Sequence, residues 1–247
     1  MKEFEYHYNI RSGWRGRLES PASIGAKFLN TLDALNRVDP MFADWELTDL
    51  RAMSSLPLAA ARSRVAGLVE KNVVLDDFRK PDPDYGYHAI ATTGEFNDPS
   101  GIQLKVDAGG KYKGGTLLQV GDYDVPSDPA VVTYPLFKAA LLAVNAIWLA
   151  NWANAYAFKL HYDKAPLIPG APLFPYSLFH IPWLAYLSAP LAVDLGLPPE
   201  IVTERTPDGG LLMIATEERL DPTNFEHLRR ARILAETLIA RTDHFSS

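Results

Sequence analysis

Histidine and carboxylate side chains are the residues that could carry catalysis or hold a metal ion in this chain. The six histidines lie at positions 7, 88, 161, 180, 227 and 244, and no two of them are three or four residues apart. The sequence therefore contains no helical metal-binding pair of the HExxH kind. His88 lies in a predicted strand, and Glu95 and Asp107 could approach it from the neighbouring part of a sheet. We favour a hydrogen-bonded strand histidine at position 88 over a metal site.

Motifs for nucleophilic catalysis and for phosphate binding are missing as well. Ser177 and Ser188 lack the flanking glycines of a GxSxG nucleophile elbow, and the chain contains no cysteine. The glycine-rich segment 109–115 does not contain GxxxxGK[ST]. We expect this segment to connect two strands, so no helix dipole assists phosphate binding there. A binding protein that is not an enzyme, with no cofactor and no metal, is therefore the expected class.

The acidic excess of the chain is concentrated in its middle fifth. The formal net charge is −6, and residues 76–128 hold ten acidic and five basic side chains. A nucleic-acid-binding protein is expected to show the opposite bias, so we expect no nucleic-acid partner. An acidic middle suits a cationic protein partner, although solvated acidic loops explain the same composition.

A short basic segment near the N-terminus surrounds a tryptophan. Arg11, Arg15 and Arg17 flank Trp14 in a stretch with two glycines, which predicts a loop over 11–17. A basic and aromatic patch can bind nucleic acid. Three arginines in a chain of net negative charge would neutralise few phosphates. We therefore favour structural roles for this segment. Trp14 would fill the core beneath the first helix, or Arg15 would pair with a carboxylate of the sheet.

The elements that must position these side chains begin with alternating strands and helices. Phe4–Ile10 alternates apolar and polar residues, which is typical of a strand. Ser20-Pro21 opens a helix, because serine caps a helix start and proline is tolerated in the first turn. This helix ends at Asp39-Pro40. Further along, the pattern predicts a strand over 42–47 and a helix over 58–70.

The middle of the chain predicts an antiparallel meander followed by a long apolar helix. The strands of the meander are Tyr85–Thr93, Ile102–Ala108 and Thr116–Val120. Pro135–Trp152 is the most apolar helix, and its asparagines and many alanines favour a buried core helix over a membrane span. We therefore expect no membrane partner. A strand over 155–160 follows.

Proline dominates the next segment, and a hairpin with a helix closes the chain. Six prolines in Ala165–Val193 predict a long aromatic loop. Strands at 201–206 and 211–216 flank a turn rich in proline and glycine. Thr223 and Glu226 form a predicted capping box for a last helix. Strands and helices follow one another in mixed order along the chain. Together with a mostly antiparallel sheet and flanking helices, this order is typical of an α+β fold. We expect one compact domain over 1–247, and a boundary between two lobes would fall near 122–129.

Two groups of residues carry a resemblance to a known family. Gly13-Trp14-Arg15-Gly16-Arg17 lies near the start, and Thr206–Leu212 with Asn224 and His227 lies near the end. In these segments the chain resembles the immunity protein 52 family of bacterial polymorphic toxin systems. The resemblance covers most of the length, including the opening strand, the first helix, the Trp45 strand and the closing hairpin.

This resemblance implies a cytoplasmic, non-enzymatic α+β protein that binds and neutralises a cognate toxin. The toxin in such pairs often carries a restriction-endonuclease-like nuclease domain and is frequently delivered by contact-dependent or type VI secretion. The N-terminus shows no apolar segment of a secretory signal, which agrees with the cytoplasm. No catalytic residues carry over, since the family is expected to act by binding. The matching residues are expected to determine the fold: Gly13, Trp14, Asp208, Gly209 and Gly210.

Two sets of residues are candidates for contact with the partner. An acidic set could complement the basic cleft of a nuclease and speed association. It consists of Asp82, Asp84, Glu95, Asp98, Asp122, Asp124 and Asp128. An aromatic set in the 165–193 loop could supply the anchors that dominate interface energetics. It consists of Phe174, Tyr176, Phe179 and Trp183.

Two alternatives stay open. The first is a small hydrolase whose site is assembled from distant residues, namely His88, Asp107 and His161, and a bound metal would favour it. The second is a structural adaptor that uses the 165–193 loop to join an assembly. Stable self-association without a toxin would favour the adaptor.

Overall fold

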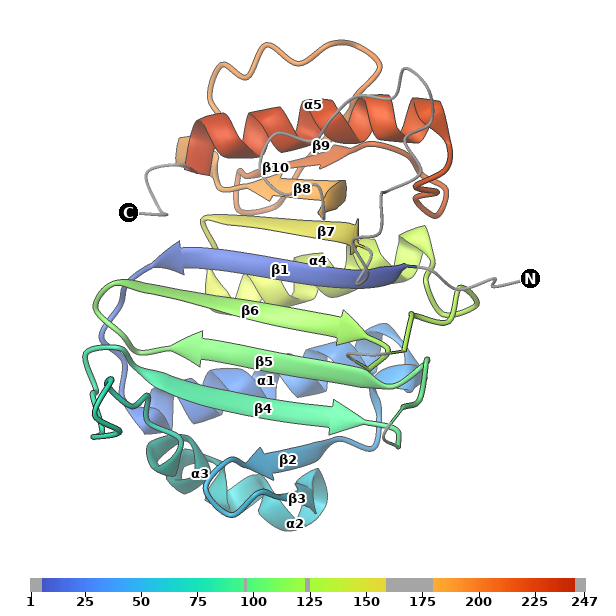
Figure 1. Cartoon of the computed structure of the whole chain (residues 1–247). Coiled ribbons are helices and arrows are strands. Elements are labelled where there is room, and N and C mark those ends of the chain that lie inside the picture. The colour runs from blue at the N-terminus through green and yellow to red at the C-terminus, as the bar shows by residue number, and fades with distance from the viewer. Residues whose placement is uncertain (1–5, 96, 123–124, 159–179, 243–247) are drawn as a thin grey trace.

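One antiparallel sheet organises the part of the chain that the structure describes, residues 6–95, 97–122, 125–158 and 180–242 of a computed structural model. The strand order is β3-β2-β4-β5-β6-β1-β7-β8-β10-β9 (Figure 1). The strands are β1 (His7–Arg15), β2 (Glu46–Asp49), β3 (Ser54–Pro57), β4 (Tyr87–Thr93), β5 (Ile102–Ala108), β6 (Lys113–Val120), β7 (Trp152–Phe158), β8 (Ile181–Leu187), β9 (Val202–Arg205) and β10 (Leu211–Ile214). With its flanking helices, this sheet confirms the α+β prediction.

Helices lie on both faces of the sheet but cover different strands. The helices are α1 (Pro21–Val38), α2 (Leu58–Ala61), α3 (Val65–Lys71), α4 (Tyr134–Trp148) and α5 (Phe225–Thr242), with short 3₁₀ turns at Pro40–Phe42, Arg62–Arg64 and Ala189–Leu191. Figure 1 shows α1 and α4 behind the sheet. α5 packs against β8 on the other face. The second face of the strands β4, β5, β6 and β1 has no helix over it among the described residues.

Strand β10 shows how the two faces are separated. Leu212 and Ile214 belong to the larger core, which also contains the buried residues of α1 and α4. Leu211 and Met213 belong to a second core with residues of α5. Because alternate residues of a strand point to opposite faces, the two cores lie on the two sides of the sheet. Burial on both faces explains why this strand is apolar at every position.

The first strand lies at the centre of the sheet and is longer than the sequence predicts. The predicted loop over 11–17 is wrong for residues 11–15, which continue β1 between β6 and β7. Gly13 pairs with Gly115 on one side and with Trp152 on the other. A Cβ atom at Gly13 would lie 2.6 Å from the Trp152 ring. This glycine therefore permits close approach of a side chain and does not mark a turn.

Part of the predicted aromatic loop is a buried strand. Residues 181–187 form β8, whereas Phe174, Tyr176 and Phe179 lie outside the described residues. Pro182 fits there because the pairing of β8 with β7 shifts register at Ala155/Tyr156, and a proline is tolerated at such an irregularity. Most of the adaptor alternative therefore rests on residues that the structure does not describe.

Trp183 is a core residue, so its prediction as a surface anchor is wrong. Its side chain is 0% exposed, and its indole N–H donates a 2.9 Å hydrogen bond to the Thr216 carbonyl oxygen. A buried tryptophan needs such a partner for its single donor. An aromatic-rich sequence pattern does not by itself distinguish an exposed anchor from a core residue.

Several predicted element boundaries move for local reasons. The predicted strand over 42–47 begins only at Glu46, because Asp39 accepts a hydrogen bond from the Met41 N–H and starts a 3₁₀ turn. The predicted helix over 58–70 is divided into α2, a 3₁₀ turn and α3. The edge strand β3 is missing from the prediction, since its polar residues show no apolar alternation.

The end of α4 and the start of α5 also differ from the prediction. α4 ends at Trp148, because Leu149 adopts a left-handed conformation with φ of 47°, and Trp152 already belongs to β7. The side chain of Asn224, not of Thr223, caps α5, since its Oδ1 accepts hydrogen bonds from the N–H groups of Glu226 and His227. Asparagine is among the strongest N-cap residues, and here it lies one position later than the capping box predicts.

The sheet is continuous across residues 122–129. β1 pairs with β6 before this segment and with β7 after it, so one strand joins both parts. The described part of the chain is a single domain, and the lobe boundary stays a prediction. Among the described residues no helix is both long and apolar enough to cross a membrane.

Candidate partner-binding surfaces

An acidic cleft lies at the end of the sheet where β4 ends and β5 begins. Its volume is about 410 Å³, and its described lining contains four carboxylates, from Glu46, Glu95, Asp98 and Asp122, but no lysine or arginine. Gly94 and Gly121 have φ of 76° and 82°, which lets the chain turn sharply at the ends of β4 and β6. Carboxylates from β2 and from two turns therefore converge on one opening.

Backbone hydrogen bonds hold the loops of this cleft together. The Gly121 N–H donates to the Gly101 carbonyl oxygen at 2.8 Å, and Asp122 Oδ2 accepts a 3.1 Å hydrogen bond from the Asn97 N–H. Asp128 lies beside them, since its Oδ2 accepts a 3.2 Å hydrogen bond from Ser100 Oγ. The predicted residues Glu95, Asp98, Asp122 and Asp128 are thus brought to one end of the sheet.

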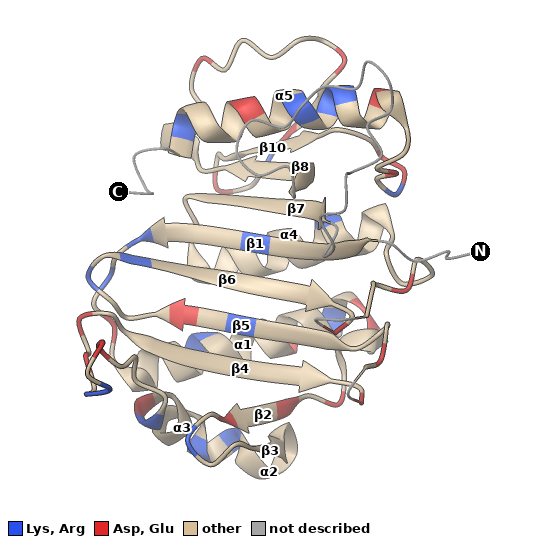
Figure 2. Ribbon diagram, in the orientation of Figure 1, with Lys and Arg blue, Asp and Glu red and all other residues tan. Residues whose placement is uncertain are grey.

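The other acidic candidates lie elsewhere. Asp82 and Asp84 precede β4, whereas Glu95 follows it, so the seven residues of β4 separate them by roughly 20 Å. Asp84 also pairs with Lys111 in the turn between β5 and β6. Asp124 lies outside the described residues. The acidic middle therefore divides into two regions at opposite ends of the sheet and does not form one surface. Figure 2 shows acidic residues in red at both ends.

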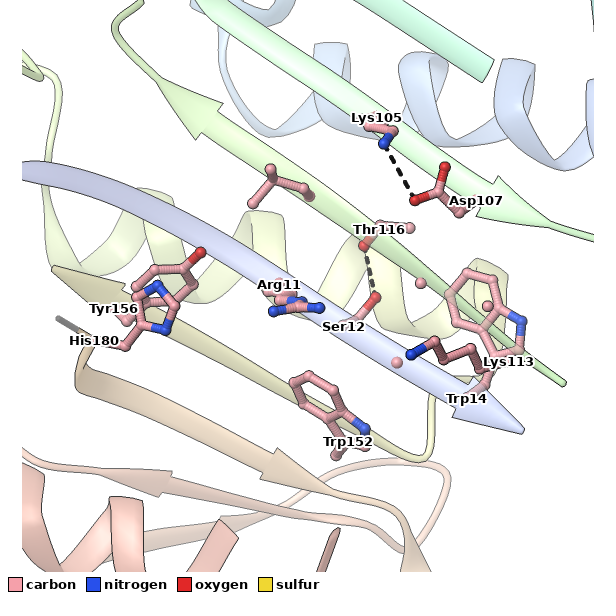
Figure 3. A pocket seen from close by; sticks show the side chains of 14 residues that line it. Arg11, Ser12, Trp14, Lys105, Asp107, Lys113, Thr116, Trp152, Tyr156 and His180 are labelled. Atoms are coloured by element: carbon pink, nitrogen blue, oxygen red, sulfur yellow. Dashed lines mark hydrogen bonds and ion pairs between the residues drawn. The ribbon is translucent and has the colours of Figure 1, made fainter. Parts of the chain in front are cut away.

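A second hollow, which we call the central groove, lies on the face of the sheet that carries no helix over β5, β6 and β1 (Figure 3). Its volume is about 520 Å³. The side chains that border it include Arg11, Lys105, Asp107, Lys113, Trp152 and Tyr156. This combination of an exposed arginine with two aromatic side chains is enriched at protein interfaces.

The charges in the central groove are mostly positive. Lys105 Nζ lies 3.4 Å from Asp107 Oδ2, and Asp107 also contacts His88 Nδ1. Arg11 and Lys113 make no hydrogen bond or ion pair with any of the described residues. Burial, and then the nearby charge of Arg11, lowers the pKa of His180 at the rim.

The hydrolase alternative needs His88, Asp107 and His161, and the structure shows only the contact between His88 and Asp107. Burial alone raises the pKa of Asp107, but the hydrogen bond from His88 and the charge of Lys105 outweigh it, so the net pKa is lowered. His161 lies outside the described residues, and Glu95 lies at the opposite end of β4 from His88. The metal site of His88, Glu95 and Asp107 is therefore not assembled. Among the described residues no group of three metal-ligating side chains is close enough to hold an ion.

The closing hairpin residues take part in packing at the end of β8. Tyr186 donates a 2.5 Å hydrogen bond to Asp208 Oδ2, and Asp208 Oδ1 accepts one from the Gly210 N–H at 3.1 Å. A Cβ atom at Gly210 would lie 2.6 Å from the Tyr186 ring, and Gly209 has φ of 81°. Each of these residues therefore has a structural reason for its type, independent of any partner.

Sequence reasoning did not identify the central groove. Its residues come from four strands that are far apart in the chain, and Arg11 was assigned to a loop. The glycines Gly13, Gly114 and Gly115 were the available signal, because glycines inside paired strands often mark close approach by another group. Glycines are also typical of turns, and the sequence alone predicts turns at these positions.

Known proteins resemble this chain in two respects, its family and its fold. The chain matches the family model described as "Immunity protein 52" over residues 6–242. The fold is similar to that of the Pseudomonas aeruginosa T6SS protein PA0821, with a TM-score of 0.54 and 11% sequence identity. The alignment covers 96% of this chain and 73% of that chain. At this identity the likeness concerns the fold alone. No curated protein matches the chain.

Proposed function

The chain belongs to the immunity protein 52 family, and from this premise we propose that it binds a cognate bacterial toxin directly and neutralises it without catalysis. The observation that carries the proposal is the family match over nearly the whole described fold. The cytoplasm of the producing cell is the compartment in which such protection would act. A type VI delivery route for the toxin is part of the proposal and is supported by the fold that the chain shares with a T6SS protein.

We further propose that the toxin is a nuclease and that the acidic cleft faces its basic nucleic-acid-binding surface. Nucleases need cationic side chains to hold the phosphate backbone. The cleft offers the carboxylates of Glu46, Glu95, Asp98 and Asp122 without a compensating lysine or arginine in its described lining. Opposite charges of this kind raise the association rate more than they raise the affinity.

Co-expression with the product of the neighbouring gene tests the function itself. We expect that product to be toxic alone, to be tolerated in the presence of this protein, and to be recovered with it as a stoichiometric complex. Nuclease activity of the purified product should be lost in the complex. A harmless neighbour that does not bind would contradict the proposal.

Charge reversal tests the role of the acidic cleft. Glu46 and Glu95 are both exposed, so E46K/E95K should leave the fold intact. We expect about a tenfold slower association at low ionic strength and a smaller effect at high ionic strength. The matched control is E70K/D77K, which makes the same charge change at exposed positions away from the cleft. Equal association rates of the two variants would exclude the cleft as the contact surface.

A further inference from the structure

We propose that the central groove docks an acidic segment of the partner protein, with Arg11 and Lys113 as the cations that receive its carboxylates. The inference depends on the proposed function in one respect, namely that the partner is the toxin. It assigns a second contact surface, opposite in charge to the acidic cleft.

The register of the strands creates the hollow. Asp107, Gly115, Gly13 and Trp152 lie opposite one another on β5, β6, β1 and β7 and form one row across the sheet. The two middle positions of this row are glycines. The Trp152 ring lies against Gly13, where an added Cβ atom would be 2.6 Å from it, and the backbone of Gly115 carries no side chain over it beside Asp107. The backbones of Asp107 and Trp152 are three strand spacings apart, which is roughly 14 Å, and the Trp152 ring occupies the part of this width over Gly13. The two strand spacings that remain between Gly13 and Asp107, roughly 10 Å, admit an extended chain.

Cations stand on both sides of the glycine row. Two residues away along the strands, Lys105, Leu117 and Arg11 form the next row on the same face. Lys113 lies two residues from Gly115 in the other direction, at the start of β6. The groove therefore has glycine backbone in its floor, the Trp152 ring along one wall, and basic side chains at both ends. Figure 3 shows Arg11 and Lys113 on either side of this floor.

The free charge of the groove is positive although the whole chain carries a formal net charge of −6. Asp107 is already engaged by Lys105 and His88, whereas Arg11 and Lys113 have no partner among the described residues. Unpaired cations grouped around a hollow in an acidic protein indicate a negatively charged ligand by charge complementarity.

The walls favour a peptide over a nucleic acid. Trp152 and Leu117 are half-buried, so each still presents apolar surface to the groove, and Tyr156 lies at one end. Such side chains gain from contact with the apolar parts of a polypeptide. A long polyanion would be repelled by the acidic excess elsewhere on the molecule, whereas a short acidic segment meets only the groove.

The first test uses a probe that does not depend on the toxin. Hexaglutamate is titrated into the full-length protein, and the amide resonances of Gly13, Gly114 and Gly115 are followed by NMR. We expect saturable, salt-sensitive shifts of these resonances, and we expect them to disappear in R11E/K113E. The control R64E/K80E reverses two exposed cations elsewhere and should keep the shifts. Absence of shifts in the natural protein, or stronger binding of a single-stranded oligonucleotide at the same resonances, would overturn the inference.

The second test uses the complex itself. For the product of the neighbouring gene, R11E/K113E should weaken binding by about 100-fold, whereas R64E/K80E should change it little. R11Q/K113Q removes the two positive charges without adding negative ones and should give an intermediate loss, which keeps the test decisive if the reversed variant folds poorly. Replacement of acidic residues of the partner by lysine should restore binding to R11E/K113E.

The two tests separate the two proposals. If hexaglutamate binds the groove but the product of the neighbouring gene does not bind the natural protein, the proposed function is wrong, whereas the groove remains a binding site for acidic peptides. If the product binds the natural protein and R11E/K113E equally, the function stands and the groove is not the contact surface.

Discussion

Trp14 and Trp148 lie face to face, with ring centroids 5.2 Å apart and ring planes within 7° of parallel. Arg17 lies over the Trp14 ring at 5.0 Å, and Lys27 lies over the Trp148 ring at 5.7 Å. Glu19 contacts both cations, at 3.7 Å from Arg17 and 2.6 Å from Lys27. The stack thus ties the end of β1 to α4, and the two cations that lie over its rings both contact Glu19 just before α1.

Replacement of Trp14 by alanine should therefore be strongly destabilising. Trp14 is 3% exposed, and its loss leaves a large cavity against Trp148. We expect a loss of about 3–5 kcal/mol in the free energy of unfolding, measured by urea denaturation. W14F keeps an aromatic face for Trp148 and for Arg17, so it should lose clearly less. Equal losses for the two variants would show that the stack adds nothing beyond occupied volume.

Two glycines provide a matched pair for the effect of an added methyl group. A Cβ atom at Gly16 would lie 2.1 Å from the Lys111 carbonyl oxygen, a backbone atom that cannot move aside easily. Gly67 lies within α3 and has nothing within 4 Å of the same position. We expect G16A to lower the melting temperature and G67A to stabilise by about 1 kcal/mol, since alanine is the better helix former. Destabilisation by G67A would contradict the packing around α3.

The hydrogen bond from Tyr186 to Asp208 should contribute to stability in a pH-dependent way. Tyr186 is 2% exposed, and Y186F leaves a carboxylate without one of its donors, at a cost of about 1.5–3 kcal/mol. Y85F, at an exposed tyrosine, is the control.

The direction of the pH effect follows from Asp208. Burial alone raises its pKa, but hydrogen bonds from Thr206, Tyr186 and the Gly210 N–H lower it overall. The unfolded chain therefore takes up this proton first on acidification, at a pH of about 4, and the stabilisation is lost below that pH. Thermal denaturation as a function of pH should show a smaller loss on acidification for Y186F than for the natural protein.

His180 predicts a second pH dependence, closer to neutrality. Burial and the charge of Arg11 lower the pKa of this imidazole in the folded state. The unfolded chain binds the proton first, at about pH 6.5, so the free energy of unfolding should decrease as the pH falls below that value. H180Q removes the titrating group and should flatten this part of the profile. Identical profiles for the two proteins between pH 7 and pH 5 would contradict the prediction, and R11Q should shift the natural profile in the direction of H180Q.

Local sequence patterns predicted two kinds of element: strands in which apolar and polar residues alternate, and helices whose capping residue lies next to the helix in the sequence. The meander of β4, β5 and β6, the capped helix α1 and the closing hairpin were recognised because their signals lie within a few adjacent residues. β8 was missed because its proline content resembles a loop, and only the register shift opposite Ala155 and Tyr156 explains how a proline fits there.

By itself, the sequence determined the α+β class, the absence of a catalytic motif and the family to which the chain belongs, since each depends on residue types and short spacings. The tertiary structure decided which side chains meet. It divided the acidic residues between two ends of the sheet, buried Trp183, and placed Gly13 opposite Gly115 so that Arg11 and Lys113 border a hollow. The physical reason is strand register, which pairs residues that are about a hundred positions apart and which no local pattern encodes.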